Sequence, residues 1–212
     1  MKNIISLKTK YITSALIIML LFCAPSIADY TGDKPLGTYL HDTINGNIIY
    51  LANSSYIVLD PNHTTSVDLN ISLPSGSTVK IARLYSYYTW SKSGEPANLS
   101  MRFNGISLSE DQHYWDSKGS EPFDYPSGTI VYNVTEYVKV SGSYTATIEN
   151  TGTDSFSNYG IAILVVYKAP YPLIEYWIKE GCDILYNTTN ITAENATTSA
   201  LFSGEIAIET VK

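Results

Sequence analysis

The chain has 212 residues, with 13 basic and 20 acidic residues and a formal net charge of −7. It is 44% hydrophobic and 16% charged, so it can bury a core of domain size without covalent cross-links. An acidic chain without a basic cluster argues against nucleic acid or an anionic membrane as partner.

Residues 1–28 have the features of a cleaved signal peptide. Lysines precede the apolar run 12–22, and Ser26-Ile27-Ala28 supplies the small residues that signal peptidase recognises. The run is shorter than the ~20 residues that span a bilayer. We therefore expect cleavage after Ala28, an extracellular or cell-surface location, and no transmembrane span in the mature chain.

Strand patterns follow residue 30, and no helical period of useful length occurs. Alternating or unbroken apolar runs, bounded by Gly, Pro, Asn and Asp, predict strands at 67–73, 79–90, 99–103, 129–138, 144–149, 160–167, 173–178 and 201–208. Asn104-Gly105 predicts a tight hairpin turn. The apolar run 160–167 predicts a strand that is buried on both faces.

Many short strands without helices predict an all-β fold, a β-sandwich or a jelly-roll-like single domain over residues 30–212. Segments 91–97, 107–127 and 186–198 lack a periodic apolar pattern. We expect them to be loops, and loops of such a scaffold are the candidate binding sites.

Aromatic residues offer candidate sugar-binding surfaces, because a ring face is apolar while Tyr O–H and Trp N–H donate hydrogen bonds. Tyr114 and Trp115, in a predicted loop beside Asp111 and Asp116, are the better candidates. Trp90 is a further candidate, although aromatic residues in strands more often pack across strands.

Acidic residues of the same predicted loop are a weak calcium candidate. Glu110, Asp111 and Asp116 could supply oxygen ligands, but the EF-hand spacing is missing and a solvated acidic loop is the commoner explanation. We expect no other cofactor.

Sequence motifs of enzymes are missing. The chain has no Gly-x-Ser-x-Gly elbow and no phosphate-binding glycine loop. His41, His63 and His113 each lack a second His or Cys at zinc-ligand spacing. The sequence therefore predicts a protein that is not an enzyme, with a glycan hydrolase that pairs two carboxylates in space as a remote alternative.

Cysteine and asparagine usage fit an exported protein. Cys23 leaves with the signal peptide, so Cys182 is left alone and is expected to be buried. Eight Asn-x-Ser/Thr sequons predict a glycoprotein. They begin at Asn53, Asn62, Asn70, Asn98, Asn133, Asn187, Asn190 and Asn195.

Arg83 lies within a predicted strand, between the apolar residues Ile81 and Tyr85 of the same face. A buried arginine must be paired or must reach the edge of the sheet. We assign a structural ion pair to Arg83 and Asp183, with Glu180 as the alternative partner, rather than an anion-binding site.

A series of short motifs has a familiar order. They are Gly32-Asp33-Lys34-Pro35-Leu36, Leu73-Pro74-Ser75-Gly76, Val79–Tyr85, Phe103-Asn104-Gly105, Tyr132-Asn133-Val134-Thr135, Ala146–Gly152, Tyr159–Tyr167, Tyr176–Gly181 with Asp183, Thr197-Thr198 and Phe202-Ser203-Gly204. In this order they resemble the domain-of-unknown-function family 3344, found mostly in exported proteins of methanogenic archaea.

The resemblance implies a β-rich protein of the cell envelope without an established activity or assigned catalytic residues. Many members continue into a second β-rich half, so this chain would correspond to the first half of a longer architecture. An uncovered edge at 206–211 would then promote self-association.

These observations together predict a secreted or cell-surface, non-enzymatic protein of an archaeon, either an envelope component or an adhesion module. Its expected partners are other surface proteins or glycans. The alternative is a lectin-like carbohydrate-binding module that acts through Tyr114 and Trp115.

Overall fold

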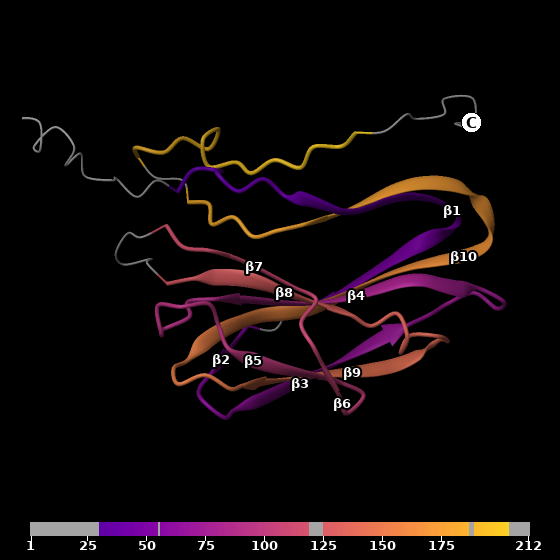
Figure 1. Cartoon of the computed structure of the whole chain (residues 1–212), viewed down its shortest axis with the longest axis horizontal. Helices are drawn as coiled ribbons and strands as arrows, with labels where there is room; N and C mark the ends of the chain where they lie inside the picture. The colour runs from indigo at the N-terminus through magenta and orange to yellow at the C-terminus, as the bar shows by residue number, and fades with distance from the viewer. Residues whose placement is uncertain (1–29, 55, 119–124, 187–188, 204–212) are drawn as a thin grey trace, which may run out of the picture.

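The computed structural model describes residues 30–54, 56–118, 125–186 and 189–203. The expected signal peptide, most of the predicted strand 201–208 and the predicted edge 206–211 lie outside these residues. Strands account for the regular structure that is described (Figure 1), and no helix in this part of the chain is long and apolar enough to cross a membrane.

The ten strands of the described residues form a β-sandwich of two antiparallel sheets. They are β1 (Gly37–Asn53), β2 (Ile57–Leu59), β3 (Thr64–Ile71), β4 (Thr78–Thr89), β5 (Leu99–Phe103), β6 (Ile106–Leu108), β7 (Gln112–Asp116), β8 (Ser127–Asn133), β9 (Gly142–Asn150) and β10 (Phe156–Glu180). One sheet has the order β1-β10-β4-β8-β7, with β2 also paired to β10, and the other has the order β3-β9-β5-β6. The predicted all-β sandwich is therefore confirmed.

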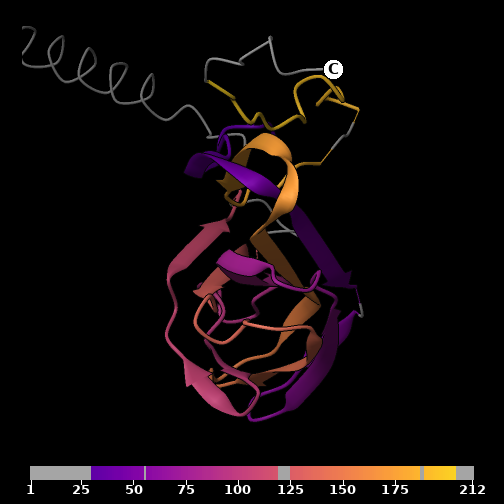
Figure 2. The ribbon, with the colours of Figure 1, turned by 90° about the vertical axis from the view of Figure 1, so that its right-hand side faces the viewer.

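The main core lies between the two sheets, and Figure 2 shows the strands surrounding it. Alternation explains which side chains enter it, because successive residues of a strand point to opposite faces. In β9, for example, Tyr144, Ala146 and Ile148 are buried and the residues between them are not. Phe103 of β5 stacks on Tyr144 with a ring-centroid distance of 5.5 Å.

The hairpin between β5 and β6 turns at the predicted dipeptide. Asn104 and Gly105 have φ values of 49° and 80°, and a two-residue turn with positive φ at both positions matches the twist of the strands that it joins. The predicted Asn-Gly turn is confirmed.

β1 and β10 are much longer than the other strands and fold back over the six-stranded sheet (Figure 1). Their pairing shifts at the bend, from Asn45 opposite Leu173 to Gly46 opposite Lys168. The four residues of β10 left between these pairs include Pro170 and Pro172, which have no N–H for a ladder. We call the folded-back part, residues 37–45 with 173–180, the arm.

The bend brings two backbones into close contact. A Cβ atom on Gly46 would lie 1.9 Å from the carbonyl oxygen of Tyr167, so only glycine fits at this position. The sharp turn of the arm therefore depends on one residue of β1.

The arm has a small apolar core of its own against the outer face of the sheet. Ile44, Tyr176 and Ile178 of the arm form a buried cluster with Val166 of β10. The packing of the arm on the sheet explains why residues 160–167 are buried almost throughout. One face of this part of β10 contacts the main core and the other lies under the arm. The prediction of a strand buried on both faces is confirmed.

Three features of the fold differ from the sequence predictions. The predicted strands 160–167 and 173–178 are parts of the single strand β10. β1 and β2 had no predicted counterpart, although β1 has 17 residues. Segment 107–127 was predicted to be a loop but contains β7, whose polar and aromatic residues show little apolar alternation because β7 is an edge strand paired only with β8.

Candidate functional site

The end of the arm away from the bend is held by a buried charged network around Arg83. This residue of β4 is completely buried, and its Nε and Nη2 atoms donate hydrogen bonds of 2.9 and 2.8 Å to the carboxylate of Glu180 at the end of β10. Its Nη1 atom donates to Asp111, and the ring of Tyr39 lies 3.5 Å from the guanidinium carbon. The arginine is therefore paired, hydrogen-bonded and stacked at once, which is what a buried charge requires.

Tyrosine hydroxyls complete the network. Tyr85 and Tyr114 donate hydrogen bonds of 2.9 and 3.3 Å to Glu180. Burial and the charge of Glu180 raise the pKa of Tyr85, and they raise the pKa of Tyr114 to about 12. Burial alone would lower the pKa of Arg83, but hydrogen bonds to Glu180 and Asp111 raise it overall, so the guanidinium stays charged.

Arg83 pairs with Glu180, so the assignment to Asp183 is wrong and the alternative is right. The cause is the direction of the chain after β10. Glu180 is the last residue of the strand and faces the sheet, whereas Asp183 lies three residues further on and contacts Lys118 at 3.1 Å.

Lys118 is the centre of a second ionic cluster, which we call the Lys118 cluster. Its ammonium group contacts Asp33, Asp116 at 2.9 Å and Asp183 at 3.1 Å, and Lys34 contacts Asp116 at 2.8 Å. The side chains of Lys118, Asp116 and Asp183 are at most 3% exposed. The cluster ties the chain before β1, the end of β7 and the chain after β10 together.

The three aspartates of this cluster have carboxylate oxygens within 4.8 Å of one another, a spacing that a metal ion could use. The Lys118 ammonium already contacts all three, however. Hydrogen bonds from Lys34, the Ile184 N–H and Lys118 lower the pKa of Asp116 in spite of its burial. The arrangement is a set of ion pairs rather than a ligand shell.

The weak calcium candidate consisted of Glu110, Asp111 and Asp116, and the structure does not bring them together. Glu110 lies 3.5 Å from His113, Asp111 contacts Arg83, and Asp116 belongs to the Lys118 cluster. Asp111 immediately precedes β7 and Asp116 is its last residue, and an extended strand separates residues five apart by roughly 16 Å.

His113 of β7 is joined to the core through Tyr88. The Tyr88 hydroxyl and His113 Nε2 are 2.9 Å apart. Tyr88 belongs to β4 and His113 to β7, and the Tyr88 ring crosses Gly128 of the intervening strand β8. A Cβ atom at Gly128 would lie within 2.6 Å of three atoms of Tyr88. Burial lowers the pKa of His113, although Glu110 opposes this effect, so the neutral ring is favoured.

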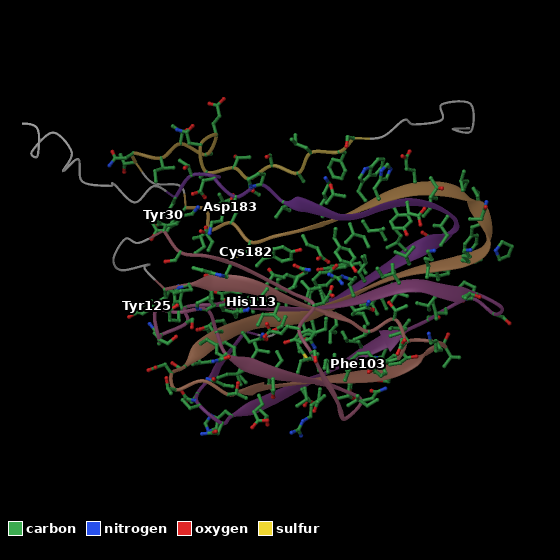
Figure 3. All side chains as sticks on the ribbon, in the orientation of Figure 1. Tyr30, Phe103, His113, Tyr125, Cys182 and Asp183 are labelled. Atoms are coloured by element: carbon green, nitrogen blue, oxygen red, sulfur yellow. The ribbon has the colours of Figure 1, made fainter. Side chains whose placement is uncertain are left out.

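A pocket of about 390 Å³ opens beside β7. Its lining includes Tyr114 and Trp115 of β7, His113, Lys34, Glu180 and Cys182. Trp115 is 45% exposed, and the Lys34 ammonium lies 5.3 Å from the centre of its ring. Figure 3 shows His113 on the sheet below and Cys182 on the chain above.

Cys182 is half-buried and its thiol is free. Its sulfur lies 3.4 Å from the carbonyl oxygen of Ser127, and burial with the charge of Asp116 raises the pKa of the thiol to about 11.

Two of the five predicted sugar-binding residues share this pocket and three do not. Tyr114 and Trp115 line it, whereas Asp111 and Asp116 do not, and their carboxylates are in ion pairs with Arg83 and Lys118. Trp90 follows β4, is 44% exposed and lies 5.1 Å from Lys92, which also contacts the ring of Tyr125. The predicted loop 91–97 that follows it does lack regular structure.

The remaining pocket residues were missed as site residues, although a signal for them was present. Lys34 and Pro35 belong to the first motif of the family resemblance, and Glu180 and Gly181 belong to the motif that ends β10. The fold brings these two motifs together beside β7, which neither motif could indicate alone.

Comparison with protein families gives a match to this chain. The family described as "Protein of unknown function (DUF3344)" matches residues 29–212. A search of curated proteins found no match. A match over this length means that the chain belongs to this family of proteins of unknown function.

Proposed function

We propose that this protein is an exported, non-enzymatic binding module of the archaeal cell surface, either an envelope component or an adhesion module. The observation that carries the proposal is the exposure of its sequons. The asparagines at 62, 70, 98, 133, 190 and 195 are exposed, Asn53 is half-buried, and Asn187 lies outside the described residues. A glycan attached at any of the six exposed positions would point into solvent.

The use of charge supports a binding role over a catalytic one. Arg83, Glu180 and Asp111 hold the arm. Lys118 and Asp116 hold the chain after β10 through Asp183. Charged side chains that are occupied in ion pairs stabilise the fold and are not free for acid–base chemistry. This arrangement suits a protein that binds a partner through its surface.

Fractionation of native cells with intact-mass analysis tests the proposal. We expect the mature protein in the envelope fraction, with Asp29 as its first residue and with added glycan mass. Recovery of the protein in the cytoplasm with residues 1–28 still attached would contradict it.

The pocket beside β7 favours a second candidate function, recognition of a glycan. A half-exposed tryptophan can stack on the apolar face of a sugar ring, and the Tyr114 hydroxyl with the Lys34 ammonium offers hydrogen-bonding groups at the same opening. Its volume of about 390 Å³ lies within the range of small-ligand pockets and suits one or two sugar units.

A glycan array, run with and without calcium, tests this second function. We expect Trp115→Ala to weaken binding about tenfold, from the loss of one stacking contact and its buried area. Trp90→Ala is the matched control, because Trp90 is equally exposed but lies outside the pocket. Absence of any array signal, or equal binding by both variants, would reject the pocket as a glycan site.

A further inference from the structure

A second aromatic surface lies at the other edge of the six-stranded sheet. Tyr50 of β1, Tyr56 before β2 and Tyr159 of β10 are 55%, 56% and 54% exposed. β1 and β7 are at opposite ends of the sheet order, and none of these three tyrosines lines the pocket beside β7, which we call the Trp115 pocket. With Tyr87 of β4 we call them the tyrosine face.

The four side chains form two contacting pairs, and the pairing of β4 with β10 places the pairs next to each other in the sheet. The hydroxyls of Tyr50 and Tyr87 are 3.3 Å apart, and Tyr87 is paired with Gly160, the neighbour of Tyr159. The rings of Tyr159 and Tyr56 meet edge to face at a centroid distance of 5.2 Å. Contacts of this kind hold the rings in place, so a ligand would meet an ordered surface.

Hydroxyl groups are available along the same surface. The Tyr56 hydroxyl lies 3.2 Å from Ser157 Oγ, and either atom can be the donor. Tyrosine hydroxyls that bond to one another or to serine keep acceptor capacity for a ligand.

Exposure of Tyr159 is built into the backbone. A β-bulge interrupts the pairing of β10 with β4 between Asn158 and Gly160, and a bulge re-aims the side chain at which it occurs. Gly160 has a φ of 145°, and a Cβ atom there would lie 2.2 Å from the carbonyl oxygen of Asn53. The chain thus uses an obligatory glycine next to a tyrosine that is turned toward solvent.

The segments that form this surface carry no charge, although the chain as a whole is acidic. Residues 43–59, 84–91 and 155–167 contain no Asp, Glu, Lys or Arg. An acidic or basic polymer would find no ion-pairing group on these segments, whereas the flat faces and hydroxyls of tyrosine match the apolar faces and hydroxyls of sugar rings.

We propose that the tyrosine face binds a neutral polysaccharide chain, with Tyr56 and Tyr159 as its stacking residues and Tyr50 and Tyr87 as hydrogen-bonding residues. This site extends the proposed surface function and does not depend on the Trp115 pocket. A module with both sites would contact glycan at two edges of one sheet.

Affinity electrophoresis of the full mature chain tests the site, in gels that contain mannan, laminarin or dextran as neutral polymers and polygalacturonate or chitosan as charged ones. We expect retardation in at least one neutral gel. The double variant Tyr56→Ala/Tyr159→Ala should bind about tenfold more weakly, from the loss of two stacking rings. Tyr171→Ala is the matched control, since Tyr171 is 42% exposed at the bend of the arm, and thermal unfolding of each variant verifies its fold.

Distinct outcomes separate this site from the pocket. If Trp115→Ala loses the retardation and the double tyrosine variant keeps it, the binding belongs to the pocket and the tyrosine face is rejected. Retardation in the charged gels alone, or in none, also rejects it. A further outcome is that no neutral gel retards the protein, but the unmodified chain binds deglycosylated envelope protein and the double tyrosine variant alone does not. This result would assign the tyrosine face to a protein partner and overturn the proposal.

Discussion

Arg83 and Glu180 are 97 residues apart in the chain and share two hydrogen bonds of 2.9 and 2.8 Å in the interior of the protein. One belongs to the sheet and the other to the end of the arm, so this pair fixes the arm on the outer face of the sheet. Removing Glu180 would leave the buried guanidinium with only the partly exposed Asp111 to compensate its charge.

Glu180→Gln is therefore expected to destabilise the protein by about 3 kcal/mol, because a neutral amide no longer compensates the buried guanidinium. Urea unfolding, followed by tryptophan fluorescence, measures the change. Glu149→Gln is the matched control, since Glu149 lies 3.9 Å from Arg102 at the surface, where an ion pair contributes less than about 1 kcal/mol. Equal effects of the two substitutions would contradict the role of Glu180 in holding the arm.

Gly128→Ala should be destabilising by about 1–3 kcal/mol, because the new methyl group would overlap the ring of Tyr88. Thermal unfolding measures the loss, and Tyr88→Leu in the same chain should recover part of it by removing the ring. Gly142→Ala provides the comparison, since its nearest neighbour would be 3.8 Å away. A Gly128→Ala protein as stable as the Gly142→Ala protein would show that Tyr88 moves aside freely.

Acid should weaken the Lys118 cluster through Asp116. The pKa of Asp116 in the folded protein is below its ordinary value of 3.8, so its stabilising contribution is present above that value and is lost as the pH falls through the folded-state value. Urea midpoints between pH 6 and pH 2.5 should fall less steeply in Asp116→Asn than in the unmodified chain. The exposed Asp154→Asn serves as control, and identical pH profiles for all three proteins would refute the assignment.

Cys182 should react slowly with alkylating reagents at pH 8. A thiol with a pKa of about 11 instead of 9.0 has about a hundredfold less thiolate at this pH, and the thiolate is the reactive form. Mass spectrometry of iodoacetamide-treated protein, folded and in urea, measures the ratio of rates. Similar rates in the two states would mean that the thiol is open to solvent beside the pocket.

Local patterns in the sequence were sufficient for much of the sandwich. Alternation of apolar residues located β3, β4, β5 and β9 to within a few residues, and Asn104-Gly105 located the hairpin, since both signals depend on residues close together in the chain. β7 was missed because a short edge strand is defined by its hydrogen bonds to β8 rather than by an apolar pattern.

The candidate site was harder to predict from the sequence than the fold. Tyr114 and Trp115 were found as aromatic neighbours, but Lys34 and Glu180 reach the same pocket from positions far away in the chain. Choosing Glu180 over Asp183 as the partner of Arg83 depended on which face the last residue of β10 presents to the sheet.

The sequence by itself determined that this protein is all-β, that residues 160–167 are buried on both faces, and that Arg83 needs an acidic partner. These conclusions follow from the period of a strand and from the free energy of burying a charge, which act locally. Only the tertiary structure decided that β1 and β10 fold back as an arm, that Asp33 and Asp183 meet at the Lys118 cluster, and that Tyr50 contacts Tyr87 while Tyr56 contacts Tyr159. Such contacts join residues that are distant in the chain, and their geometry follows from how the two sheets and the arm pack.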